Sequence, residues 1–263
     1  KGTGIMNQNE RREYLIKYLL KEEIRFGRQS IPADKQGQEN LLRSLMNVRP
    51  PRPISHEFLE IQDEYLTERN IERGITDVAT LTPVKSDSRL YIWQGDITTL
   101  KCDAIVNACN SQMLGCFSPM HACIDNFIHT YAGVELRLKM HEIMTKQGHE
   151  EETGKAKITS GYNLPAKYVL HTVGPIIQWK VTQEDENLLA SCYKECLKLA
   201  ADTGVESIAF CCLSTGVFRF PQQRAAEIAT ETVMQFLKKD DRIKKVIFNV
   251  FKNEDLEIYS HLL

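Results

Sequence analysis

The sequence predicts a three-layer α/β/α sandwich with a largely parallel sheet, preceded by a helical extension at the N-terminus. The first supporting observation is that, from Arg89 onward, short apolar runs typical of strands are separated by long amphipathic runs typical of helices. The second is that the residues before Arg89 hold helical runs and no stretch that alternates with a period of two. Strands separated by helices that cover both faces of one sheet favour a parallel arrangement.

The N-terminal part of the chain contains three predicted helices, at residues 13–23, 38–46 and 55–70. Ser55 is a suitable N-cap for the third helix. A proline-rich segment at 50–53 ends the second helix and separates it from the third. The predicted boundary is a linker at 84–88. It divides the chain into a helical extension, 1–88, and an α/β domain, 89–263.

The α/β domain contains six predicted strands, at residues 90–94, 104–107, 156–160, 168–173, 207–213 and 245–251. The predicted helices lie between and after these strands, at 124–145, 186–203, 222–239 and 255–262. We expect the first of these helices to be broken near Gly133. The helices then form the two outer layers around the sheet.

The composition is typical of a folded, globular chain: 42% of the 263 residues are hydrophobic and 26% are charged. The 33 Lys and Arg residues against 35 Asp and Glu residues leave a net charge of −2, and a chain without a basic excess is poorly suited to bind nucleic acid. No apolar run approaches the roughly 18 residues of a membrane span. Eight cysteines are too few for a disulfide scaffold, so we expect reduced thiols in a soluble, cytoplasmic protein.

Small and polar residues follow several predicted strands, where ligands of open α/β sheets bind. Asn107 and Asn110 come at the end of the second strand, and their amides could meet ligand hydroxyls or serve only as turn residues. The small-residue loop 214–218 precedes a helix, an arrangement that suits phosphate. Asp96 follows the first strand, where it could cap the backbone or accept a hydrogen bond from an adenine amino group. Together these segments resemble a site for an adenosine diphosphate with a ribose beyond it.

A Cys-x4-His-x-Cys segment, formed by Cys116, His121 and Cys123, is a candidate metal site. Two thiolates and one imidazole suit zinc. Three protein ligands leave one coordination position open, as in catalytic sites, whereas a fourth ligand such as His129 or Cys102 would make the site structural. The residues alone leave both possibilities open. The signature of zinc deaminases, which needs Pro-Cys-x-x-Cys and His-x-Glu, is absent.

Five motifs, in this order along residues 89–251, resemble those of the macrodomain family, the ADP-ribose-binding fold. They are Gln94-Gly-Asp-Ile-Thr, Asp103-Ala-Ile-Val-Asn-Ala-Cys-Asn-Ser, Gly154-Lys-Ala-Lys-Ile-Thr, Tyr168-Val-Leu-His-Thr-Val-Gly-Pro and Leu213-Ser-Thr-Gly-Val-Phe. The resemblance implies the macrodomain form of the α/β/α sandwich, with a mixed, largely parallel sheet.

The resemblance also implies a role for each matching residue. Asp96 would hold the adenine amino group, with Ile97 beside it, and Asn107 and Asn110 would face the distal ribose. The diphosphate would be wrapped by the backbone of Ser214, Thr215, Gly216, Val217 and Phe218. One departure is Cys109, at a position where macrodomains usually have alanine; we take it as a tolerated small residue.

The segment after Asn110 resembles one particular subgroup of macrodomains. Common hydrolytic macrodomains have a glycine-rich loop here, whereas the Cys116, His121 and Cys123 loop resembles the zinc-dependent macrodomains of certain bacteria and fungi, often encoded near a class M sirtuin. The helical extension resembles that subgroup too. Asp125 matches the acidic position that lies near the distal ribose in hydrolytic macrodomains, although an Asp in the first turn of a helix is also favoured by the helix dipole.

This subgroup resemblance implies a zinc-dependent hydrolase, of the glycohydrolase or esterase type, that removes mono-ADP-ribose from modified proteins. The expected bond is an ester to Asp or Glu, the expected cofactor is Zn²⁺, and the catalytic residues would be Asn107, Asn110 and Asp125. The expected partners are ADP-ribose, the modified protein and an operon-linked class M sirtuin system. The alternative is a reader module that binds ADP-ribose without cleaving it and holds a structural zinc. We expect His129 and His171 to be hydrogen-bonded core histidines.

Overall fold

The computed structural model describes residues 5–26 and 28–263, so positions 1–4 and 27 of the expected extension lie outside the described residues. The extension consists of α1 (Gln8–Glu22), a short 3-10 helix (Ile24–Phe26), α2 (Lys35–Val48) and α3 (His56–Arg73). Each α-helix begins at a side chain that accepts a hydrogen bond from its first turn, namely Asn7, Asp34 and Ser55. The three predicted helices are therefore confirmed, each with more residues than the pattern indicated.

The main sheet has six strands in the order β2-β8-β7-β4-β6-β5. The strands are β2 (Leu90–Gln94), β4 (Ala104–Ala108), β5 (Ala156–Ser160), β6 (Tyr168–Thr172), β7 (Ser207–Phe210) and β8 (Lys245–Val250). All neighbouring pairs are parallel except β5 and β6, which are antiparallel. The predicted mixed, largely parallel sheet is confirmed. A two-stranded sheet of β1 (Thr76–Asp77) and β3 (Leu100–Lys101) was not expected, because two residues are too few to show a pattern.

Strand β7 is three residues shorter than the sequence indicated. The apolar run continues to Leu213, but the strand ends at Phe210 and Ser214 has a φ of 64°. This left-handed backbone cannot continue a strand. Hydrophobic residues beyond Phe210 are therefore loop residues at the edge of the sheet.

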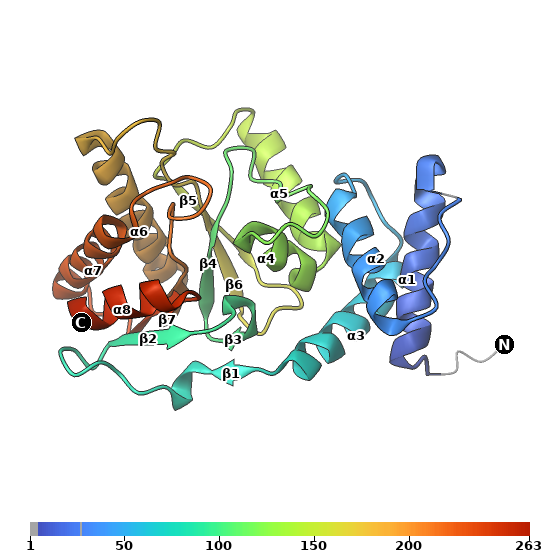
Figure 1. Cartoon of the computed structure of the whole chain (residues 1–263), viewed down its shortest axis with the longest axis horizontal. Coiled ribbons are helices and arrows are strands. Elements are labelled where there is room, and N and C mark those ends of the chain that lie inside the picture. The colour runs from blue at the N-terminus through green and yellow to red at the C-terminus, as the bar shows by residue number, and fades with distance from the viewer. Residues whose placement is uncertain (1–4, 27) are drawn as a thin grey trace.

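Five helices complete the domain: α4 (Ile124–Ala132), α5 (Val134–Gln147), α6 (Gln183–Thr203), α7 (Gln222–Lys239) and α8 (Asn253–Leu262). The break at Gly133 is confirmed, and its φ of 103° explains why glycine separates α4 from α5. Helices α6, α7 and α8 share a hydrophobic core with one face of the sheet, and α4 and α5 share a second core with the other. The three-layer arrangement is visible in Figure 1.

The extension packs against the helical layer formed by α4 and α5 (Figure 1). Its own core of leucines and aromatic residues includes Val134 from α5. The buried Gln62 side chain accepts a hydrogen bond from the Val134 backbone over 2.8 Å, and Asn70 donates to the Asn163 carbonyl over 2.8 Å. Among the described residues, no helix is long and apolar enough to cross a membrane.

Candidate functional site

A cleft of about 670 Å³ opens at the carboxyl ends of β4, β7 and β8. This is the edge at which parallel sheets bind ligands. Its walls come from the loops that follow these strands and from the segment that leads into α4. The lining includes most of the residues that the sequence singled out, namely Asn110, Cys116, His121, Cys123, Asp125, Ser214, Thr215, Gly216, Val217 and Phe218.

The loop 214–218 lines this cleft. None of its five N–H groups donates a hydrogen bond within the described residues. The loop is held from outside instead: the Phe220 N–H donates to the Ser214 carbonyl over 2.8 Å, and the Ile177 N–H donates to the Phe218 carbonyl over 2.9 Å. Unpaired N–H groups just before a helix, here α7, suit a phosphate or diphosphate.

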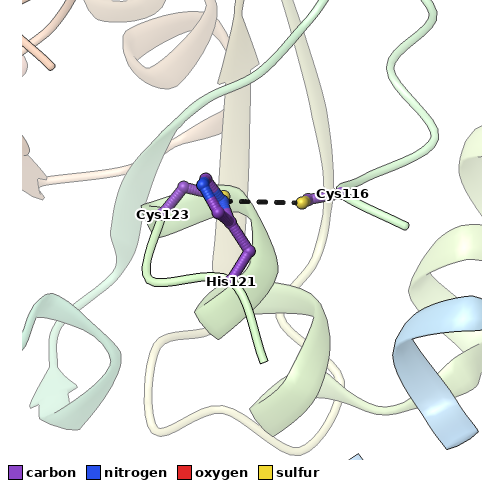
Figure 2. A group of neighbouring side chains, drawn as sticks. All are labelled: Cys116, His121 and Cys123. Carbon is purple, nitrogen blue, oxygen red and sulfur yellow. Dashed lines mark hydrogen bonds between the residues drawn. The ribbon is translucent and has the colours of Figure 1, made fainter. Parts of the chain in front are cut away.

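Cys116, His121 and Cys123 also line the cleft and lie together, with their side chains pointing toward one another (Figure 2). Their ligand atoms all lie within 4.8 Å of one another, and Cys116 Sγ is 3.8 Å from His121 Nδ1. Two ligand atoms of a tetrahedral zinc, bonded at 2.3 and about 2.0 Å, would lie roughly 3.5 Å apart. The donor set and its spacing therefore fit zinc with little movement.

The residues considered as a fourth ligand lie outside this cluster. Among the described residues, the group that could hold a metal consists of Cys116, His121 and Cys123 alone. The buried Cys102 thiol donates to the Ala104 carbonyl, and His129 Nε2 lies 3.6 Å from Asp125 Oδ1. A metal held by these three ligands alone would keep one coordination position for a non-protein ligand.

Asp125 lies two residues after the cluster residue Cys123 and is buried in the domain. It lies in the first turn of α4, is 5% exposed and lines the cleft. Burial raises the pKa of its carboxyl to about 6, although a hydrogen bond from Asn107 and the charge of Arg137 oppose the increase. The Asp125 carboxylate is therefore almost fully buried, yet it lines the cleft and could accept a hydrogen bond from a ligand there.

Asn107 does not line the cleft. Its side chain is fully buried, and Nδ2 donates to Asp125 Oδ1 over 2.8 Å and lies 3.2 Å from His171 Nδ1. His171 Nε2 is in turn 2.9 Å from Thr159 Oγ1, and burial lowers the pKa of His171 to about 3. The neutral ring therefore accepts from Asn107 and donates to Thr159, as expected for a hydrogen-bonded core histidine.

His129 differs from that expectation. Its ring is buried and its pKa is held well below its ordinary value by burial first and then by the charge of Arg137. Yet Nε2 has no hydrogen-bond partner among the described residues. The ring fills the space beside Gly115, where an added Cβ would lie 2.9 Å from it.

Asn110 lies at the cleft and also forms a turn. Its Oδ1 accepts hydrogen bonds from the N–H groups of Gln112 and Met113, over 3.1 and 3.2 Å. Asn110 can therefore stabilise the turn and still contact a ligand in the cleft. Cys109, the departure from the family pattern, is buried and lines the same wall, and its thiol donates to the Thr172 carbonyl over 3.3 Å.

Asp96 and Ile97 lie outside the lining of the cleft. Asp96 Oδ2 accepts a hydrogen bond from Arg73 of α3 over 2.6 Å, and Oδ1 accepts one from the Thr98 N–H over 2.9 Å. Ile97 is 1% exposed and belongs to the core. The capping role that the sequence allowed for Asp96 is therefore present in the structure.

Three residues that the sequence did not single out line the cleft near β8: Gln222, Lys252 and Asp255. Gln222 donates to Asp255 Oδ1 over 3.0 Å, which joins the start of α7 to the start of α8. Lys252 and Asp255 follow β8 as Asn110 follows β4. The rule that ligands bind beyond the carboxyl ends of parallel strands could have found them.

The comparisons with known proteins agree with this geometry. A family model described as Macro domain matches residues 106–229. The protein-ADP-ribose hydrolase of Treponema medium is 57% identical over 260 residues, which cover 98% of this chain and 100% of that protein. An Oceanobacillus iheyensis macrodomain mutant with ADPR has a TM-score of 0.60 at 39% identity and covers 65% of this chain and 90% of its own. The Trypanosoma brucei macrodomain in complex with ADP-ribose has a TM-score of 0.63 at 26% identity and covers 99% of this chain and 92% of its own, so the likeness includes the helical extension.

Proposed function

Because this chain belongs to the macrodomain family, we propose that it is a zinc-dependent hydrolase that removes mono-ADP-ribose from modified proteins. One observation carries the proposal: the metal cluster, Asp125 and the loop 214–218 line the same cleft. The Treponema medium relative, which matches along its whole length, is named a protein-ADP-ribose hydrolase. The cleft is also large enough for a ligand of this size, since such pockets typically measure about 300–1,000 Å³.

The binding part of the reaction follows from the loop 214–218. Its five free N–H groups would hold the diphosphate without a charged side chain. The adenosine would then lie toward Lys252 and Asp255, and the distal ribose toward Asn110 and Asp125. Asp96 would accept a hydrogen bond from the adenine amino group, with Ile97 beside it.

The cleavage part of the reaction takes place at the distal ribose. Cys116, His121 and Cys123 would hold a zinc ion, which would supply Lewis-acid chemistry when bound. Asp125 would accept a hydrogen bond from a hydroxyl or a water there, and Asn107 would fix the orientation of its carboxylate. We propose an ester to Asp or Glu as the bond that breaks, because a carboxylate of ordinary pKa near 4 is a good leaving group.

Two further properties belong to the proposal. All eight cysteines are free in the structure, which supports a reducing, cytoplasmic location. The resemblance to the zinc-dependent subgroup further suggests a class M sirtuin system as a partner, and the neighbourhood of the gene would test that suggestion.

The test is release of ADP-ribose from an Asp/Glu-modified protein by the wild type and by Cys123→Ala, with zinc content measured in parallel. Cys102→Ala is the matched control, because it removes a cysteine outside the metal cluster. We expect one zinc per chain and release by the wild type and the control, and neither zinc nor release in the folded Cys123→Ala variant. Release that continues without the metal would contradict zinc dependence. If the wild type binds ADP-ribose but releases none, the protein is a reader.

A further inference from the structure

The metal ligands lie on a surface loop with no secondary structure between β4 and α4. Cys116 and Cys123 are half-buried, His121 is exposed, and Met120 has a left-handed φ of 60°. Within the segment, the His121 N–H donates to the Ser118 carbonyl over 3.2 Å, and this one turn does not hold all three ligand atoms in place. Contacts from other parts of the chain also fix its shape, and they come from α2 of the N-terminal extension, from α4 and from α5.

The first contact is made by Arg43 of α2. Its Nη2 donates to the carbonyl of the ligand residue His121 over 3.0 Å and to Asn126 Oδ1 over 2.9 Å. The guanidinium also lies over the Phe127 ring, 4.5 Å from the ring centroid. One side chain from the extension therefore joins the backbone of a metal ligand to the first turn of α4, which begins after the ligand Cys123.

The second contact is made by Asn47, one turn further along α2. Asn47 is 2% exposed, and its Oδ1 accepts a hydrogen bond from the Met120 N–H over 3.1 Å. Its Nδ2 donates to Thr130 Oγ1 over 3.1 Å. The amide thus holds the left-handed residue that precedes His121 at a fixed position relative to α4.

The third contact is made by Arg137 of α5, which holds the part of the loop that contains Cys116. Its Nε and Nη2 donate to the carbonyls of Leu114 and Cys116, over 2.7 and 3.2 Å. Its Nη1 donates to the carbonyls of Asn47 and Arg49 at the end of α2, over 2.7 Å in each case. Arg137 therefore ties the Cys116 segment to the same helix that holds the His121 segment.

We propose that α2 of the extension is a positioning element for the metal site, with Arg43 and Asn47 as its positioning residues. The inference rests on the proposed function in one respect, namely that the cluster binds zinc. Neither side chain lines the ADP-ribose cleft. Their loss should therefore change the geometry and affinity of the metal site while leaving ADP-ribose binding in place, which separates this role from a contact with the substrate.

The experiment uses the full chain and the variants Arg43→Ala, Arg43→Lys and Asn47→Ala. Arg11→Ala is the matched control, because Arg11 forms ion pairs with Glu64 and Glu68 inside the extension. Zinc affinity is measured by competition with a chromophoric chelator, and site geometry by the visible absorption spectrum of the Co²⁺-substituted protein. ADP-ribose affinity is measured by calorimetry, and folding by circular dichroism.

We expect Arg43→Ala and Asn47→Ala to weaken zinc binding roughly 10- to 100-fold, the usual effect of losing a group that orients a metal ligand. The Co²⁺ spectrum should change, and the ADP-ribose Kd should stay within about threefold of the wild type. Arg43→Lys keeps one donor for the His121 carbonyl, so its zinc affinity should be intermediate, and it serves as the folded test if Arg43→Ala does not fold. Arg11→Ala should match the wild type.

Unchanged zinc affinity and an unchanged Co²⁺ spectrum in folded Arg43 and Asn47 variants would overturn the positioning role. An equal loss in Arg11→Ala would also overturn it, because the effect would then be general loosening of the extension. A wild type that binds zinc but releases no ADP-ribose would remove the proposed activity and leave the positioning role intact. A wild type that binds no zinc would remove both.

Discussion

Asn107 Nδ2 lies 2.8 Å from Asp125 Oδ1, and of the two residues only Asp125 lines the cleft. The amide is fully buried at the end of β4 and the carboxylate lies in the first turn of α4. Asn107, which we expected to face the ribose, therefore lies behind a carboxylate that lines the cleft. A hydrogen bond to a buried charged group also stabilises the fold, by about 1.5–3 kcal/mol.

Asn107→Ala tests this arrangement. The Asp125 carboxylate would lose its donor and its fixed orientation, so we expect the single-turnover rate of ADP-ribose release to fall roughly 10- to 100-fold. The ADP-ribose Kd should stay within about threefold, because Asn107 does not line the cleft. Asn110→Ala is the control, since Asn110 lines the cleft and its loss should weaken binding. A large increase in Kd for Asn107→Ala would show direct contact with the ligand.

Asp125→Asn removes the charge and keeps the shape. If Asp125 handles a proton at the distal ribose, release should fall by about 100-fold or more, with ADP-ribose binding retained. The thermal midpoint should not decrease, because the variant no longer buries a carboxylate in surroundings that disfavour its charged form. Rate and midpoint are measured on the same preparation. Undiminished release would exclude Asp125 from the chemistry.

The sequence predicted the sheet and many of the residues that line the cleft because those features are local. Strands β2, β4 and β5 begin where the apolar runs begin, and Cys116, His121 and Cys123 are close in the chain. The rest depends on contacts between distant segments. That Asn107 faces Asp125, and that α2 holds the metal loop through Arg43, depends on how separate elements pack, which the spacing of residues does not encode.

A ligand series tests the loop 214–218. If its five free N–H groups hold the diphosphate, most of the affinity comes from hydrogen bonds to charged oxygens, each contributing about 1.5–3 kcal/mol. ADP and ADP-ribose should therefore bind at least about 100-fold more tightly than adenosine. Calorimetry at constant ionic strength measures all three ligands. Adenosine binding as tight as ADP binding would mean that the loop does not hold phosphate.

The pH dependence of stability tests the buried His171. Its pKa is lowered by burial to about 3, whereas in the unfolded chain it has its ordinary value near 6.5. Between these values the unfolded chain binds a proton that the folded chain does not, so the free energy of unfolding falls as the pH falls below 6.5. Between pH 7.5 and pH 5.0, the protonation of His171 in the unfolded chain should lower the free energy of unfolding by about 2 kcal/mol. Urea unfolding of the wild type and His171→Gln at both pH values measures it. The variant should lose about 2 kcal/mol less than the wild type, since other titrating groups are common to both, and identical losses would mean that His171 is protonated in the folded protein.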